Sequence, residues 1–319
     1  MSASDLSSRA IIGTFYNELE TTARQLWPTR LGMLFNSNQS MESYKWLGAA
    51  PAMREFLDGR KGNGPRTSGV DIVNKVFEAT EYVGVDDLRR DKSGQVLLRI
   101  KELAKRANLH WGSLLSALIL AGDSTVCYDG QNFFSASHAE GKSGTQSNLV
   151  TFDISDAGLT GVPTTPTADI VQRAILAGVQ QIMGLLDDQG EPMNEGASSF
   201  SVMVPVSYMA AATSAISLPA LSAGASNVIP ALANNSEGIK FNLITNPRLG
   251  AWTTSLAVFR DDAGTAPFIL QEEQAPVMDA IAEGSEMAIK ERRHLYTVTA
   301  IRNAGYGFWQ RACKVNLQA

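Results

Sequence analysis

Few residues in this sequence have a type and spacing that could do chemistry. Cys127 and His138 come nearest, as a thiol nucleophile with a base, which is the arrangement of a cysteine hydrolase. Cys127, however, lies in the short apolar run 125–128, without a glycine-rich oxyanion loop around it. Cysteines in such runs are most often small core residues. We therefore predict no catalytic residue and keep a cysteine hydrolase only as a distant alternative.

Phosphate and metal sites have equally weak support. Gly141-Lys142-Ser143 resembles the end of a P-loop, but Ala136 stands where the first glycine is required, and no apolar strand precedes it. The chain has three histidines, and its two cysteines, Cys127 and Cys313, lie far apart without a CxxC pattern. Spacing of this kind does not predict a ligand set. We expect no cofactor and no metal.

The composition is that of a folded, mildly acidic protein. With 319 residues, 44% of them hydrophobic, the chain has room for two domains with cores of their own. A net charge of -5 argues against a dedicated nucleic-acid-binding protein, which would carry a basic face. No basic segment that could begin a signal peptide and no apolar run that could span a membrane occurs. We expect synthesis in the cytoplasm and no membrane partner.

The element that would organise the fold is a long helix between residues 86 and 122. Apolar residues recur there at gaps of three and four, which predicts one apolar stripe along the helix; the stripe consists of Leu97, Ile100, Ala104, Ala107, Trp111, Leu115 and Leu118. Gly122 would end the helix. A short strand over 125–128 and a turn at Asp129-Gly130 would follow. We call this helix the spine helix.

Two segments before the spine helix have little core of their own. Within residues 1–35, Ile12, Phe15 and Leu19 fall on one face of an amphipathic helix that would dock on its own domain or on a neighbouring subunit. Extended segments over 41–56 and 70–85 flank a glycine-rich run and predict a long hairpin. Its tip would be a solvated loop or would lie across a second subunit.

The remainder of the chain predicts an α/β region and a returning strand. We expect mostly loop over 135–165 and an uncharged loop over 217–237 that packs on a neighbour. Between and after these loops, periodicity predicts helices from Thr167 to Asp187 and over 208–216, and strands over 200–206, 241–245, 252–259 and 267–270. Residues 294–317 would form a strand that bends at Gly305-Tyr306-Gly307 and returns to the sheet beside the spine helix.

Three strings, in this order along the chain, resemble a known family. They are Tyr44-Lys45-Trp46-Leu47-Gly48, Cys127-Tyr128-Asp129-Gly130-Gln131-Asn132-Phe133-Phe134 and Asn303-Ala304-Gly305-Tyr306-Gly307-Phe308-Trp309-Gln310. The ordered set resembles the Mu-like phage major head subunit family (gpT). That resemblance implies a mixed α+β fold of the Hong Kong 97 capsid type. Its parts would be an N-terminal arm (1–43), an E-loop (44–85), a P-domain with the spine helix (86–165), an A-domain (166–289) and a return strand of the P-domain (290–319).

The resemblance also implies a function. The chain would be the major capsid protein of a tailed double-stranded DNA phage, a virion component that assembles as hexamers and pentamers of an icosahedral shell. Candidate inter-subunit residues are Ile12, Phe15, Leu19, Tyr44, Trp46, Arg60, Lys61, Arg66, Trp111, Tyr306, Phe308 and Trp309. An encapsulin-like cellular nanocompartment shell is the alternative.

The expected partners follow from the same resemblance. They are copies of the chain, a separate scaffold or protease, a portal and a decoration protein, with weak non-specific contact to the enclosed double-stranded DNA. Because the arm begins within a dozen residues of Met1, we expect scaffolding to come from a separate protein. Lys61 and Lys75 match no cross-linking motif, so we expect non-covalent joints between subunits.

Overall fold

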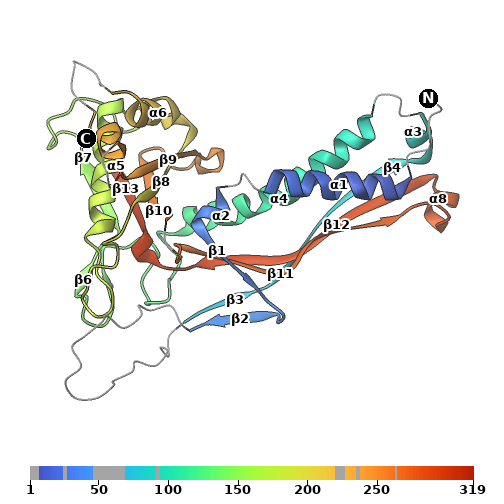
Figure 1. Ribbon diagram of the computed structural model, residues 1–319, viewed down its shortest axis with the longest axis horizontal. Coiled ribbons are helices and arrows are strands. Elements are labelled where there is room, and N and C mark those ends of the chain that lie inside the picture. The colour runs from blue at the N-terminus through green and yellow to red at the C-terminus, as the bar shows by residue number, and fades with distance from the viewer. Residues whose placement is uncertain are drawn as a thin grey trace.

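Two β-sheets organise the structure, a computed structural model that describes residues 7–23, 27–45, 69–90, 94–219, 227–234, 238–262 and 264–319. The long sheet has the strand order β1-β11-β12-β4 and the second sheet the order β7-β13-β10-β8-β9. Figure 1 shows the long sheet as a narrow ribbon that extends away from the body around the second sheet. The fold class is therefore mixed, with helices on both bodies.

The long sheet is made of strands β1 (Gly32–Asn36), β4 (Lys75–Gly84), β11 (Phe268–Ile281) and β12 (Arg293–Tyr306). Strands β11 and β12 pair antiparallel along almost their whole length, and β4 pairs antiparallel with β12. Along β12, buried residues alternate with half-exposed ones, as expected for a strand with one face against the core. We predicted only residues 267–270 of β11. Its polar continuation is held by pairing with β12, and Pro276 sits at a register shift, where a strand tolerates a missing N–H.

The spine helix is α4 (Gln95–Ala121), and α1 (Ser8–Ala23) lies beside it on the same face of the long sheet (Figure 1). Its buried stripe contains Ile100, Ala104 and Leu115 as expected, but also Asn108 and Gly112. The predicted members Leu97, Ala107, Trp111 and Leu118 are only half-buried. The stripe is displaced because α4 packs on two neighbours at once, β12 beneath it and α1 beside it.

The second body packs helices against the second sheet, whose strands are β7 (Leu149–Asp153), β8 (Ser199–Val204), β9 (Lys240–Thr245), β10 (Ser255–Arg260) and β13 (Ala312–Gln318). Helix α5 (Ala168–Met183) begins at the predicted Thr167, whose side chain caps it. It crosses β10 and β13 closely, since a Cβ on Gly178 would come within 2.9 Å of Val258. Helices α6 (Met209–Ser217) and α7 (Val228–Ala233) complete this body.

The predicted hairpin is present, with its two legs as β2 (Met41–Tyr44) and β3 (Val70–Val73) in antiparallel register. We expected one continuous strand over 70–85. Instead the chain changes partner at Asn74, because β3 pairs with β2 while β4 pairs with β12. The Asn74 amide donates to Ser37 Oγ at 3.0 Å and to Gln39 O at 2.7 Å, which fixes this break.

Three other expectations differ from the structure. Residues 125–128 form a turn closed by an isolated bridge between Val126 and Asn132, not a strand. The expected loop 135–165 contains β5 (His138–Ala139), β6 (Thr145–Gln146) and β7, and the expected loop 217–237 contains α7. Short apolar runs among Ser, Thr and Gly carry too little periodicity to predict such elements.

The largest correction concerns the end of the chain. We expected residues 290–319 to return as one piece beside the spine helix, but only β12 does so. After the 3-10 turn η4 (Trp309–Arg311), strand β13 enters the second sheet between β7 and β10. Conversely β11, expected within the A-domain range, belongs to the long sheet. The remaining short elements are α2 (Pro28–Leu31), α3 (Val85–Arg90), η1 (Val206–Tyr208), η3 (Pro247–Leu249) and α8 (Glu286–Lys290).

Candidate functional site

The residues that could have formed a hydrolase site are committed to packing. Cys127 is buried, and burial raises the pKa of its thiol well above the usual range. His138 is also buried, with Nδ1 2.5 Å from Asp129 Oδ2 and Nε2 3.2 Å from Asn148 Oδ1. Both ring nitrogens therefore contact oxygen atoms, whereas the Cys127 thiol contacts Gly307 O at 3.8 Å, so the two side chains do not form a nucleophile–base pair. This geometry gives no support to the cysteine-hydrolase alternative.

The Gly141-Lys142-Ser143 string is a tight turn between β5 and β6. The Lys142 N–H donates to Asp188 O at 3.0 Å, and Ser143 Oγ accepts from Glu140 N at 3.0 Å. A Cβ on Gly141 would lie 2.3 Å from Asp188 O, so this glycine permits contact with the adjacent loop. Its backbone groups serve local structure and do not form a phosphate cradle.

Histidine and carboxylate side chains do not converge on a metal site in the part of the chain that the structure describes. His110 lies half-buried on the spine helix, where Arg302 Nε donates to its Nδ1 at 3.2 Å. Burial, and then the charges of Arg302 and Arg248, lower the pKa of His110 to about 4. Arg302 Cζ also lies 4.8 Å from the centroid of the Trp111 ring, so Arg302 of the long sheet contacts both His110 and Trp111 of the spine helix.

Among the helices that the structure describes, none combines the length and the apolar character that a membrane span requires.

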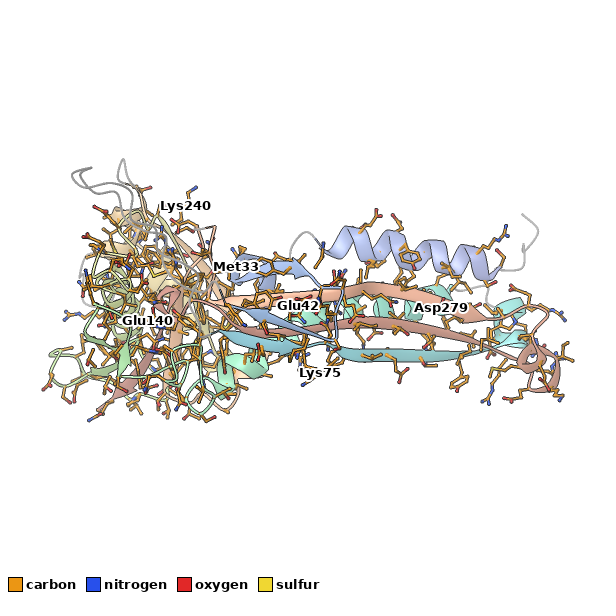
Figure 2. The ribbon with its side chains drawn as sticks, turned by 90° about the horizontal axis from the view of Figure 1, so that it is seen from below. Met33, Glu42, Lys75, Glu140, Lys240 and Asp279 are labelled. Carbon is orange, nitrogen blue, oxygen red and sulfur yellow. The ribbon has the colours of Figure 1, made fainter. Side chains whose placement is uncertain are left out.

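The second and third strings of the resemblance meet in one buried junction between the two bodies. Phe133 stacks on Tyr306 with ring centroids 4.5 Å apart, and Tyr128 donates to Gln310 at 3.0 Å. The His138 ring stacks on the Trp309 ring, with the ring centroids 3.9 Å apart and an angle of 4° between the ring planes. Figure 2 shows Glu140, which accepts a hydrogen bond from Trp309, inside the body around the second sheet. Both strings therefore fix the geometry between the two sheets.

This junction changes how the predicted contact residues are placed. Tyr306, Phe308 and Trp309 are almost fully buried within the chain itself, and the Tyr306 hydroxyl donates to Leu118 O at 2.8 Å. Trp111 is half-buried beneath Arg302. These four side chains are already packed inside a single chain, and an additional role between subunits stays a prediction.

The residues predicted on the N-terminal helix contact the chain's own spine helix. Phe15 is fully buried there, with Ile12 and Leu19 half-buried beside it. Ile11, which the sequence did not single out, is equally buried. Asn108 of α4 donates to Leu19 O at 2.7 Å, which ties the two helices together. Of the two placements that we considered for this helix, the structure shows docking on its own domain.

The hairpin is anchored at its base by Tyr44, whose hydroxyl donates to Gln271 Oε1 at 2.9 Å. A Cβ on Gly305 would lie 2.5 Å from Ile72 Cδ1, so this glycine lets β3 cross closely over β12. The other predicted hairpin residues, Trp46, Arg60, Lys61 and Arg66, lie outside the described residues.

A sequence model of the family described as "Mu-like prophage major head subunit gpT" matches residues 8–159 and 232–318. These ranges include the spine helix, both legs of the hairpin, and strands β12 and β13 on either side of the junction. The chain belongs to the Mu-like gpT major head subunit family.

Two curated relatives agree with this placement of the gpT-family chain. It is 32% identical over 109 residues to the major capsid protein of Escherichia phage Mu, covering 34% of this chain and 36% of that protein. It is 30% identical over 113 residues to the Mu-like prophage FluMu major head subunit of Haemophilus influenzae, covering 35% of this chain and 37% of that protein. The matches thus span about a third of each relative.

Solved structures show the same fold over nearly the whole gpT-family chain. The procapsid of bacteriophage JBD30 superposes with a TM-score of 0.55 at 18% identity, covering 98% of this chain and 75% of that one. The virus-like particle from Pyrococcus furiosus superposes with a TM-score of 0.52 at 8% identity, covering 97% of this chain and 98% of that one. The capsid of cyanophage P-SCSP1u superposes with a TM-score of 0.52 at 10% identity, covering 90% of this chain and 86% of that one. The fold is the Hong Kong 97-type capsid fold.

The surface of the gpT-family chain carries exposed apolar side chains, of which only Leu218 and Val228 lie in a segment, 217–237, that the sequence predicted to pack on a neighbour. One group lies around α6 and α7, where Val206, Met209, Leu218 and Val228 are each about half exposed. Others lie on the long sheet and the spine helix: Val76, Tyr82, Ile281, Leu98 and Leu109. They fall outside the periodic stripes because those stripes are used within the chain. Apolar groups of this kind are typical of protein interfaces.

Proposed function

We propose that this chain is the major capsid protein of a tailed double-stranded DNA phage and that its copies form the hexamers and pentamers of an icosahedral shell. The observation that carries the proposal is the gpT family match across both bodies of the fold. Capsid proteins with the same fold support it. The protein is a virion component, synthesised in the cytoplasm of the host bacterium.

The exposed apolar groups support assembly through the ends and faces of the elongated molecule. We assign the group around α6 and α7 to contacts within a ring of subunits. The apolar residues of the long sheet and spine helix would contact adjacent rings. Interfaces in obligate assemblies commonly bury more than about 2,000 Å². Several separate patches on one narrow chain suit that requirement.

For the parts of the subunit we propose the family's arrangement with adjusted limits. The arm (1–43), the E-loop (44–85) and the P-domain with its spine helix keep their places. Because β7 and β13 pair in the second sheet, we assign both to the A-domain, and because β11 pairs with β12, we assign it to the P-domain. The inter-subunit roles of the tip residues Arg60, Lys61 and Arg66 belong to this proposal.

We further propose that the protein has a structural role and no catalytic one, and that scaffold or protease, portal and decoration functions come from other proteins. The shell would hold DNA by confinement with weak, non-specific contact, which the acidic net charge of -5 supports. The virus-like particle from Pyrococcus furiosus has the same fold, so the fold by itself does not separate a nanocompartment shell from a phage head. The match to the gpT family favours the phage head.

The test is to express the full chain together with the products of its neighbouring genes and to examine the particles by negative-stain microscopy. We expect closed icosahedral shells, with DNA in particles from infected or induced cells. Particles that contain an enzyme and no DNA would favour the nanocompartment. Subunits that never form shells, under conditions where all partners are present and folded, would contradict the proposal.

A further inference from the structure

Two arginines of the second body meet at a single amide oxygen. Arg260 ends β10 and Arg311 ends η4, and their Nη1 atoms donate to Asn194 Oδ1 at 3.2 Å and 3.0 Å. Asn194 is fully buried, and its own Nδ2 donates to Ile182 O at 2.7 Å and Gln310 O at 2.9 Å. Those two carbonyls fix the orientation of the amide, so its oxygen must face both guanidinium groups.

The charges at this place do not balance. Arg260 Nε donates to Asp262 Oδ1 at 2.6 Å, and Asp262 Oδ2 accepts from Ser198. Arg311 forms no ion pair with any residue that the structure describes, although only 8% of it is exposed. Buried charges in proteins are normally paired, since an unpaired one loses its hydration without compensation. The cluster of Arg260, Arg311 and Asp262 carries one excess positive charge.

The electrostatics and the spare hydrogen-bond donors agree with this count. Burial, followed by the charge of Arg260, lowers the pKa of Arg311 to about 10. Arg311 Nε is buried without a hydrogen-bond partner. Arg260 Nη2 and Arg311 Nη2 make no hydrogen bond within the described part of the chain and are not among its buried unpartnered atoms, so they are open to solvent or to a ligand. Several guanidinium N–H groups therefore stay unused at one position.

Gly196 leaves space beside these groups. A Cβ built on Gly196 would lie 4.0 Å from Arg260 Nη2 and would meet no other atom within 4 Å. Every other residue type would place a side chain there. The glycine therefore keeps one approach to the Arg260 guanidinium open.

We propose that Arg260 and Arg311 form a binding site for an oxyanion of the phosphate class. Guanidinium groups bind phosphate oxygens through paired, charge-assisted N–H donors. A phosphate group supplies more acceptor oxygens and more negative charge than a carboxylate, which fits several unused donors and an excess positive charge. The ligand is free phosphate or a phosphate of a nucleic-acid backbone. This site goes beyond the shell function and does not require assembly.

The first experiment compares thermal unfolding of the full chain in phosphate and in chloride at equal ionic strength. We expect saturating phosphate to raise the unfolding midpoint by about 3 °C, because a ligand that binds only the folded state stabilises it. In R311M, which keeps most of the apolar stem but loses the charge, the phosphate-specific rise should disappear. In the matched control R106M, whose arginine is exposed on α4, the rise should persist.

A second variant keeps the test decisive if R311M does not fold. G196D places a carboxylate beside Arg260, so it should raise the midpoint in chloride and abolish the response to phosphate. G250D is its control, since a Cβ on Gly250 would also meet no atom within 4 Å, and the pocket that Gly250 lines includes neither Arg260 nor Arg311. A phosphate response that is absent from the parent chain, or that survives in R311M or G196D, would overturn the proposal.

The source of the phosphate is separated by a binding measurement with a short DNA duplex. Binding of the duplex by the parent chain and its loss in R311M would identify a backbone phosphate. Phosphate-dependent stabilisation lost in R311M, without any effect of the variant on duplex binding, would identify a site for free phosphate.

Discussion

Replacing Gly305 by alanine tests how the hairpin is fixed to the long sheet. In the folded chain the added Cβ would lie 2.5 Å from Ile72 Cδ1 and 2.8 Å from Ile72 Cγ1, well inside van der Waals contact. Ile72 is buried on β3, so its side chain cannot turn away into solvent. The conflict must be relieved by moving Ile72 or by lifting β3 from β12.

The expected cost follows from two opposing effects. Overpacking a buried contact costs about 1–3 kcal/mol. Loss of the glycine's conformational freedom in the unfolded chain returns about 0.4–1 kcal/mol. We therefore expect G305A to lower the free energy of unfolding by about 1–2 kcal/mol. Hydrogen exchange should become faster in β2 and β3 while the spine helix stays protected.

A double-mutant cycle isolates the contact. I72V removes the Cδ1 methyl and alone should cost about 1 kcal/mol, but in the G305A background it should cost little, because it creates the room that alanine needs. Urea denaturation of the four proteins gives the coupling energy, and G250A, at an open position, is the control for the glycine effect. If the two substitutions are additive, or exchange in the hairpin is unchanged, the argument that Gly305 exists for the β3 crossing is refuted.

Three further predictions concern other parts of the chain. C127A should lower the free energy of unfolding by only about 1–2 kcal/mol, as expected for a small buried side chain, and should leave particle formation intact. Loss of an enzymatic activity in a folded C127A variant would instead support the cysteine hydrolase. F15A should lower the free energy with which α1 docks on the spine helix by about 3–5 kcal/mol and should increase proteolysis near the N-terminus. The control R9A, at an exposed position of the same helix, should leave proteolysis unchanged, and equal proteolysis of F15A and R9A would contradict the docking of α1 on the spine helix. Because folding lowers the pKa of His110 to about 4, the unfolded chain binds the extra proton first as the pH falls. The full shift corresponds to about 3 kcal/mol, but solvent reaches the half-buried ring, so we expect the free energy of unfolding to fall by about 2 kcal/mol between about pH 6.5 and about pH 4. Urea denaturation across that range should show a smaller fall for H110N, and identical profiles would exclude His110 as the cause.

The sequence predicts most of the regular elements but not which sheet each one joins. The spine helix, α5 with its Thr167 cap and the hairpin legs follow from local periodicity and capping. The sheet assignments of β11 and β13 do not, because pairing between distant strands depends on tertiary contacts that alternation does not encode. The turn at η4 is the decisive case. A bend at Gly305-Tyr306-Gly307 is visible in the sequence, but the direction it takes is set by the packing of Phe133, Tyr306 and Trp309.

The candidate surfaces were less accessible to such reasoning. Large aromatic residues in the matched strings suggested contacts between subunits, yet Tyr306 and Trp309 pack inside the chain. Conversely, Leu98 and Leu109 on the spine helix are exposed although their type is typical of a core. Sequence periodicity cannot separate a stripe used within a chain from one used between chains, since both are apolar. The paired arginines at Asn194 were also missed, because residues 260 and 311 are brought together only by the β10–β13 pairing.

The position of β13 has a consequence for the order in which the second body folds. Strand β13 (Ala312–Gln318) occupies an inner position in its sheet, with β7 on one side and β10 on the other. Among the described strands, β7 pairs with β13 alone, so β13 is what joins β7 to the rest of the sheet. These strands are far apart in the sequence, and pairing between distant segments is slow because a long stretch of chain must be ordered before the contact forms. We therefore expect β7 to join the sheet late, in the same cooperative step that inserts β13.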